Sequence, residues 1–347
     1  MNERLQLTVN GMLLALGIGW ILYIGKSVFV PIVFSVLVAY VIVGLTRLLF
    51  LLPFVGRFLP RQIGYTLAAL VIAFVVAAIV SLVATSLSEV VALAPQYEGA
   101  VLNAIQDVAV RLGFESPTWE TLRQELLAQI NTQKVIGSTV VSVSSIVSSV
   151  IVVLLYVAFL LIEQRAFSDK INRVSGDPKH VAYIKRVITH INARIGTYLA
   201  LKTLVSLVQG LICWGILALF GVEFATFWAV LIGLLNYIPY IGSFLGVVLP
   251  VAFGLVQFAD LNVVLALLLA LSAAQFVIGF FLDPYLMGNS LNLSPFVILV
   301  SLAVWSALWG IAGAFLAVPM TACMALVFAE FEGTRPIAVF LSKNGRL

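Results

Sequence analysis

Polar side chains inside two apolar stretches carry most of the chemistry that this sequence offers. Along 195–220 they recur at alternating steps of four and three residues, which places them on one side of a helix: Tyr198, Lys202, Ser206, Gln209 and Cys213. A polar side chain in a lipid-bounded helix is costly unless it faces a polar interior. Gln209 lies too deep to reach the surface, so we expect it to face a polar pathway. For Lys202 two alternatives stay open: an ion-coupling role, or snorkelling to the membrane surface.

A second polar face follows along 262–285, where Ser272, Gln275, Gly279 and Asp283 lie on roughly one side of a helix and Pro284 comes next. A carboxylate in an apolar span can exchange a proton or bind a cation, so Asp283 is the candidate for ion coupling and Gln275 for the substrate pathway. The alternative for Asp283 is a boundary aspartate that caps a helix or forms an ion pair at the membrane surface.

The apolar stretch 224–258 is interrupted by a helix-breaking segment. As one straight helix it is about 50 Å long, against a hydrocarbon core of roughly 30 Å. Backbone that departs from helix inside a bilayer must be satisfied by protein or by a watery cavity. We therefore expect residues of the break to line a substrate pathway: Asn236, Tyr237, Pro239, Tyr240 and Gly242.

The outline of this broken stretch returns in 294–331. An ungapped shift of 69 residues puts Phe227 on Phe296 and Pro250 on Pro319. In the repeat the break falls at Trp309, Gly310 and Gly313, which we add to the predicted pathway. Two interrupted segments in matching positions indicate a transport site. Two long kinked helices are the alternative, and re-entrant hairpins cannot be told from full spans by charge counting.

The composition requires an all-α polytopic membrane protein. The chain is 62% hydrophobic and 10% charged, which is far more apolar surface than a soluble domain of 347 residues buries. It contains no phosphate-binding loop, zinc-binding helix or nucleophile elbow, and its two cysteines and two histidines have no metal-ligand spacing. We expect no enzyme activity, no metal and no cofactor. The 19 basic residues form no run of the kind that binds nucleic acid.

The apolar stretches predict about eight hydrophobic segments, two of them broken: 8–25, 28–46, 64–88, 139–162, 195–220, 224–258, 262–285 and 294–331. They divide the chain into three N-terminal spans (1–88), an extracytoplasmic helical insert (89–138), two spans with a basic cytoplasmic loop (139–223), a transport core (224–331) and a cytoplasmic tail (332–347). If both termini are cytoplasmic, most basic residues lie next to the cytoplasmic ends of the spans. This asymmetry fixes the orientation of the chain in the membrane. A stripe of small residues, Ser138, Ser142, Ser145 and Ser149, favours close helix packing and a homo-oligomer of unknown order.

Three motifs in the C-terminal half carry a family resemblance: Leu235-Asn236-Tyr237-Ile238-Pro239-Tyr240-Ile241-Gly242; Gln275 followed by Pro284-Tyr285-Leu286-Met287-Gly288; and Gly310-Ile311-Ala312-Gly313 leading to Leu316-Ala317-Val318-Pro319. The chain resembles the autoinducer-2 exporter (AI-2E) family of bacterial transporters and permeases. The resemblance implies a multi-pass protein of the bacterial inner membrane. It also implies export of autoinducer-2 for some members and sodium or lithium exchange for protons for others. Many relatives have an acid and an Asn where this chain has Ile278 and Phe280, which argues against cation coupling.

These observations predict a secondary transporter or facilitator that exports a small polar solute, for example an autoinducer-2-like signal. An antiporter that exchanges sodium or lithium ions for protons through Asp283 is the alternative within transport. A non-transporting membrane scaffold built around the insert 89–138 is the alternative of another class. The expected partners are the lipid bilayer and a small polar solute or cation.

Overall fold

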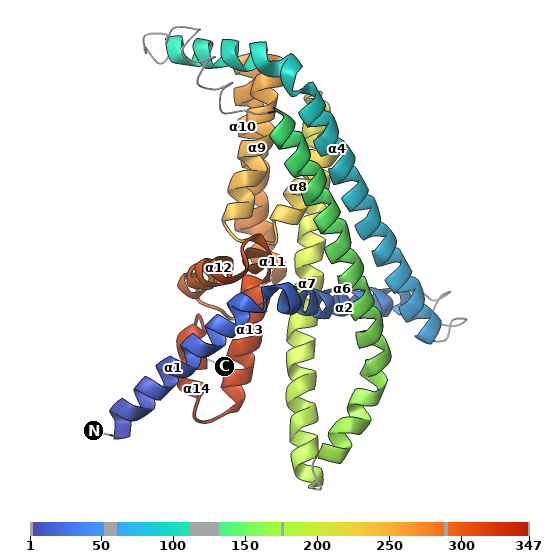
Figure 1. Cartoon of the computed structure of the whole chain (residues 1–347), viewed down its shortest axis with the longest axis vertical. Helices are drawn as coiled ribbons and strands as arrows, with labels where there is room; N and C mark the ends of the chain where they lie inside the picture. The colour runs from blue at the N-terminus through green and yellow to red at the C-terminus, as the bar shows by residue number, and fades with distance from the viewer. Residues whose placement is uncertain (1–2, 52–60, 112–131, 175–176, 288–290, 346–347) are drawn as a thin grey trace. The chain divides into compact units, whose positions relative to one another are not determined.

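A computed structural model of the chain describes residues 3–51, 61–111, 132–174, 177–287 and 291–345 (Figure 1). These residues form helices, and the β-structure among them is a single antiparallel bridge between Leu293 and Ser342. Within the described ranges, six helices are long and apolar enough to cross a membrane: 26–46, 63–90, 178–219, 241–258, 261–287 and 311–330. The predicted all-α polytopic membrane protein is confirmed.

The first half of the chain forms long helices: α1 (Glu3–Ile24), α2 (Lys26–Leu51), α4 (Arg61–Arg111), α6 (Thr132–Val174) and α7 (Pro178–Leu219). Each predicted apolar stretch of this half matches one of them to within one residue, although α4, α6 and α7 extend well beyond it. The predicted helical insert 89–138 begins within α4, which continues without a break to Arg111. Residues 112–131 of the insert lie outside the described residues, as do the side chains of Ser138, Ser142 and Ser145.

The second half is built from shorter pieces: α8 (Ala225–Leu235), α9 (Ile241–Phe258), α10 (Leu261–Val277), the π-helical turn η1 (Ile278–Leu282), α11 (Asp283–Met287), α12 (Pro295–Trp309), α13 (Ile311–Glu330) and α14 (Arg335–Leu341). Both predicted breaks are confirmed, because α8 ends before α9 begins and α12 ends before α13 begins. The 11 residues of α8 extend only about 16 Å, which is too short to cross a bilayer.

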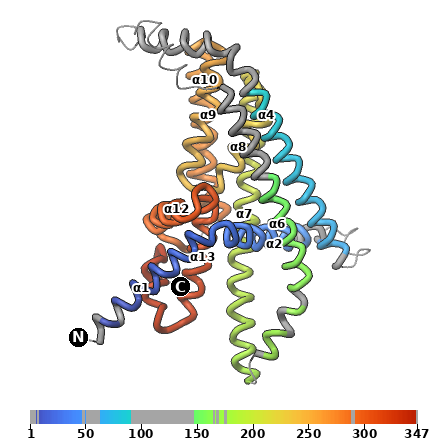
Figure 2. The backbone as a smooth tube through the Cα atoms, viewed as in Figure 1, coloured from blue at the N-terminus to red at the C-terminus, as the bar shows by residue number. Residues whose placement is uncertain are grey.

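The chain divides into two compact units. Unit 1 contains Met1–Ala69, Val150–Ala200 and Asn289–Leu347, and unit 2 contains Leu70–Ser149 and Leu201–Gly288. The chain passes between the units within the long helices α4, α6 and α7, which can be followed along the trace in Figure 2. The predicted transport core 224–331 is thus shared between the two units.

Unit 2 has an apolar core formed by α7, α8, α9 and α10, with Cys213, Leu217, Ile232, Leu267 and Leu271 among its most buried side chains. Figure 1 shows α9 and α10 side by side. The helices α7 and α8 meet backbone to backbone. A Cβ atom on Gly210 would lie 3.2 Å from the carbonyl oxygen of Ala229, and one on Gly233 would lie 3.1 Å from that of Ser206. Larger residues at either glycine would push the two helices apart.

The helices α8 and α9 form a hairpin. At the turn, a Cβ atom on Gly242 would lie 1.9 Å from the carbonyl oxygen of Leu235, so only glycine fits there. At the open end, the Gln257 side chain of α9 accepts a hydrogen bond from the backbone N–H of Glu223 at 2.9 Å and donates one to the carbonyl of Gly221 at 2.9 Å. The end of α9 therefore lies beside the start of α8.

The helices α12 and α13 of unit 1 form a similar turn. Gly310 has a φ of +63°, and a Cβ atom on Gly313 would lie 1.8 Å from the carbonyl oxygen of Trp305. The indole N–H of Trp305 donates to Thr321 Oγ1 at 3.1 Å, which ties the two helices together. The second helix of each pair contains a buried proline, Pro250 in α9 and Pro319 in α13, as the sequence repeat predicts.

Candidate functional site

Lys202 lies at the centre of a polar cluster in unit 2. Its side chain, on α7, is 9% exposed, so it does not extend to an exposed position as snorkelling requires. The ammonium Nζ lies 3.2 Å from Asp283 Oδ2 and donates a longer hydrogen bond, 3.4 Å, to Asn236 Oδ1. A buried ammonium is tolerated only with such partners, and Asp283 supplies the opposite charge.

Asp283 is positioned by a change in helix type. The α-helix α10 widens into the π-helical turn η1, and Asp283 begins α11 directly afterwards. Single π-helical turns within α-helices occur frequently at functional sites. Oδ2 of the carboxylate pairs with Lys202, whereas Oδ1 is buried and has no hydrogen-bond partner among the described residues. One acceptor of this carboxylate therefore makes no hydrogen bond within the part of the chain that the structure describes.

Asn236 ends α8 at the break and joins it to α7. Its side-chain amide donates to Ser206 Oγ at 3.1 Å, while its carbonyl oxygen accepts from Lys202. The close approach of Gly210 and Gly233 brings the two backbones near enough for these short side chains to meet. The amide is 7% exposed, so its hydrogen bonds are shielded from water, where they are stronger than at an exposed position.

A glutamine pair forms the second part of the cluster. Gln209 on α7 is almost fully buried, and its Nε2 donates to Gln275 Oε1 on α10 at 2.7 Å. The amide nitrogen Nε2 of Gln275 is buried without a hydrogen-bond partner among the described residues. It lies against the backbone of α9, where a Cβ atom on Gly246 would be only 3.1 Å away. The pair thus presents an unused donor, as Asp283 presents an unused acceptor.

A search with family profiles matches residues 11–333 to a family described as "AI-2E family transporter". The chain belongs to the AI-2E transporter family. Among curated proteins it is 28% identical to the AI-2 transport protein TqsA of Escherichia coli K12 over 97% of both chains. It is 30% identical to YhhT of the same organism, over 83% of this chain and 82% of YhhT. The resemblance drawn from the three motifs is confirmed.

In this AI-2E chain, the remaining predicted residues of the first break form the turn beside the cluster. The Tyr237 hydroxyl shares a 2.6 Å hydrogen bond with Thr203 of α7. Pro239 is half-buried and Gly242 is buried within the turn, while Tyr240 is 55% exposed and has a φ of +61°. Tyr237 is thus tied to α7, whereas the other three residues shape the backbone.

The residues of the second break belong to the other compact unit. Trp309, Gly310 and Gly313 belong to unit 1, where the Trp309 indole donates to the carbonyl of Leu22 at 2.9 Å. The cluster of this AI-2E chain also contains Thr203 and Ser206, which were not predicted as site residues. Ser206 lies on the polar face of α7 that the four and three spacing predicts, so this signal was available in the sequence.

The cluster pairs one positive with one negative side chain and surrounds them with amides and hydroxyls. Because these side chains together carry no net charge, they do not neutralise the charge of a bound ion. The set therefore suits a neutral polar molecule better than an ion. No group of three or more histidine, cysteine or acidic side chains that could hold a metal ion occurs among the described residues. Ile278, which is buried, and Phe280, which is 70% exposed, have apolar side chains and add no polar group to the cluster.

Proposed function

We propose that this AI-2E protein is a secondary transporter or facilitator that exports a small polar solute, and that the cluster of Lys202, Asn236, Gln209, Gln275 and Asp283 binds the solute. The observation that carries the proposal is the unused acceptor on Asp283 together with the unused donor on Gln275. A buried polar atom without a partner costs about 1 to 3 kcal/mol. A solute hydroxyl at Asp283, or a solute carbonyl at Gln275, recovers this energy at that position.

The printed name of TqsA, an AI-2 transport protein, supports a hydroxylated signal of the autoinducer-2 kind as the solute. The short helix α8 and its return through α9 support a re-entrant hairpin whose turn reaches mid-membrane. In this arrangement both termini are cytoplasmic, in the bacterial inner membrane, and the turn carries Asn236 to the solute. A homo-oligomer of unknown order completes the proposal.

An antiporter that exchanges sodium or lithium ions for protons is the second candidate. The Lys202 ammonium is bound by oxygens of Asp283 and Asn236, and carbonyl and carboxylate oxygens are also the ligands of small cations. A cation can take this place when Lys202 loses its proton and moves away. We favour the solute carrier because the ion pair already fills the position with a fixed cation.

Flux measurements in proteoliposomes test the proposal. Wild-type protein should move a hydroxylated solute down its gradient without an imposed proton or sodium gradient. Gln275→Met, which keeps the side-chain length and removes the amide's donor and acceptor, should lower this flux several-fold, whereas Gln257→Met at the open end of the hairpin should lower it less. Uphill transport driven by a proton or sodium gradient would favour the antiporter, and no flux of any kind would favour a scaffold.

A further inference from the structure

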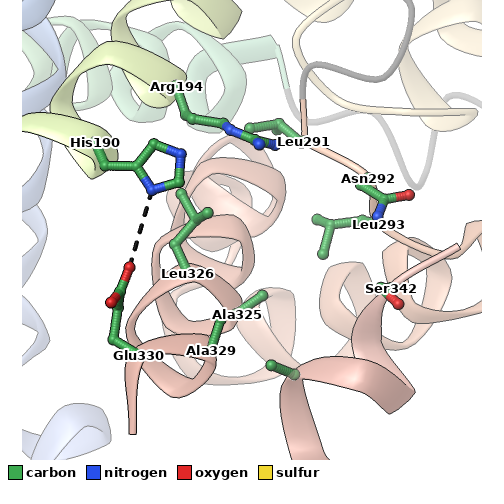
Figure 3. Close-up of a pocket in the computed structure, with 11 residues that line it drawn as sticks. His190, Arg194, Leu291, Asn292, Leu293, Ala325, Leu326, Ala329, Glu330 and Ser342 are labelled. Carbon is green, nitrogen blue, oxygen red and sulfur yellow. Dashed lines mark ion pairs between the residues drawn. The ribbon is translucent and has the colours of Figure 1, made fainter. Parts of the chain in front are cut away.

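A second polar site lines a cavity of about 200 Å³ within unit 1 (Figure 3). Its polar side chains come from α7, the segment before α12, α13 and the end of α14: His190, Arg194, Asn292, Glu330 and Ser342. Small residues leave the space open: Ala325, Ala329 and Ala338. The cavity contains none of the residues of the proposed transport site.

Backbone hydrogen bonds hold the walls of this cavity in place. His190 and Arg194 are one helical turn apart and lie on the same side of α7. The segment before α12 is fixed to the C-terminal residues, because Ser294 N donates to the carbonyl of Leu341 at 3.0 Å and Lys343 N donates to that of Asn292 at 2.9 Å. The cavity is therefore a built feature of unit 1.

The charged side chains that line the cavity differ in whether they have hydrogen-bond or ion-pair partners. The Glu330 carboxylate lies 3.9 Å from His190 Nδ1 and 3.4 Å from the hydroxyl of Tyr183, which also donates to the Glu330 carbonyl at 3.0 Å. Arg194 is half-buried, and its guanidinium makes no hydrogen bond or ion pair with any described residue. In Figure 3 its side chain extends over the cavity, away from the Glu330 carboxylate. Arg194 thus brings a guanidinium with five N–H donors to the cavity wall, and no acceptor for them lies among the described residues.

We propose that this cavity binds a phosphate group through Arg194. The planar fork of a guanidinium matches two oxygens of a phosphate, and the resulting charge-assisted hydrogen bonds are among the strongest in proteins. The remaining wall is apolar and is made by Leu291, Leu293 and Leu326, which suits a ligand with an apolar part next to its phosphate.

Two sources can supply such a phosphate: a phospholipid headgroup or a soluble phosphate ester. The adjoining helix α14 exposes apolar side chains, with Ile337 48% and Phe340 85% exposed. Apolar residues on a short surface helix suit the boundary between headgroups and acyl chains. Basic pockets between membrane helices commonly bind lipid headgroups, so the experiment must separate the lipid from the soluble ester.

The test uses full-length protein in detergent and three variants. Arg194→Gln removes the guanidinium, and Ala329→Leu fills the cavity while keeping every charge. Arg186→Gln is the control, because Arg186 loses the same charge but stacks on the Tyr183 ring, 5.5 Å from its centroid, and does not line the cavity. Native mass spectrometry counts phospholipids retained from a mixture of phosphatidylglycerol and phosphatidylethanolamine. Thermal unfolding with inorganic phosphate measures the soluble ligand.

If the ligand is a lipid headgroup, one phospholipid fewer is retained by Arg194→Gln and by Ala329→Leu than by the wild type or by Arg186→Gln. For a soluble ester, inorganic phosphate raises the melting temperature of wild type and Arg186→Gln, and half-saturation needs about tenfold more phosphate in Arg194→Gln. If Arg194→Gln fails to fold, the same two measurements on Ala329→Leu alone decide whether the cavity binds the phosphate. Equal lipid retention in all four proteins, together with no effect of phosphate, overturns the proposal.

Discussion

The ion pair between Lys202 and Asp283 makes the sharpest prediction about stability. Asp283→Asn leaves a buried ammonium without its counter-charge, and Lys202→Met leaves the carboxylate without its own. Removing one partner of a buried pair destabilises a protein by about 3 to 5 kcal/mol. The Asp283 side chain is 26% exposed, and the introduced Asn keeps an oxygen that accepts from Nζ, so we expect about 3 kcal/mol for each single variant.

The double variant Lys202→Met/Asp283→Asn removes both charges and leaves neither one unpaired. Its destabilisation should therefore be smaller than the sum of the two single effects by about 2 kcal/mol. The assay is equilibrium unfolding of purified protein in one detergent, with the four proteins compared as a double-mutant cycle. The double variant should unfold at a lower denaturant concentration than either single variant, but at a higher one than additive single effects would give.

An exposed ion pair of the same chain provides the control. Lys170 and Glu163 pair on α6 with side chains that are 63% and 53% exposed. The corresponding cycle, Lys170→Met with Glu163→Gln, should give a coupling of less than about 1 kcal/mol, since water screens the pair. Single effects at Lys202 and Asp283 that add to within about 0.5 kcal/mol would refute the buried ion pair.

Three further predictions concern the hairpin and the site. Gly242→Ala should abolish folded protein in the membrane, because its Cβ atom would lie 1.9 Å from a backbone oxygen, whereas Gly279→Ala, with no atom within 4 Å, should express normally. Asn236→Leu should lower solute flux about tenfold or more while expression survives, since it loses buried hydrogen bonds of about 1 to 3 kcal/mol; unchanged flux would remove this residue from the site. Single cysteines at Asp260 and Asn289, in a background without native cysteines, should react with membrane-impermeant reagents from the outside and the inside respectively, and the reverse pattern would indicate full spans.

Local patterns in the sequence predicted which residues belong to the site better than they predicted which of those residues make contact. The spacing of Lys202 and Gln209 along α7 reflects helical geometry, so a single helix reveals it. The excess length of 224–258 and the glycine and proline at its centre likewise predict the turn that carries Asn236. These signals depend on neighbours in the sequence.

Contacts between distant residues were not predictable in the same way. Lys202 and Asp283 were considered separately, because nothing in one sequence states that α7 and α11 meet. No sequence motif marks the π-helical turn before Asp283. The division of the chain into two compact units, which assigns Trp309 and the cluster to different units, depends on packing between helices. The unbroken length of α4 also exceeds what its apolar stretch indicates, since polar residues continue a helix as readily as they end it.

The backbone contact between Gly210 and Gly233 limits how the α8–α9 hairpin can move. With no side chain between the two helices, α8 cannot slide along α7 without lifting away from it, so rotation about the contact is the least disruptive motion. Atoms move in proportion to their distance from such a pivot. Asn236 lies three residues from Gly233, about 4.5 Å along the helix, and stays close to Ser206 during a small rotation. At the far end of α9, the hydrogen bonds of Gln257 to Gly221 and Glu223, close to the end of α7, limit how far the open end of the hairpin can swing.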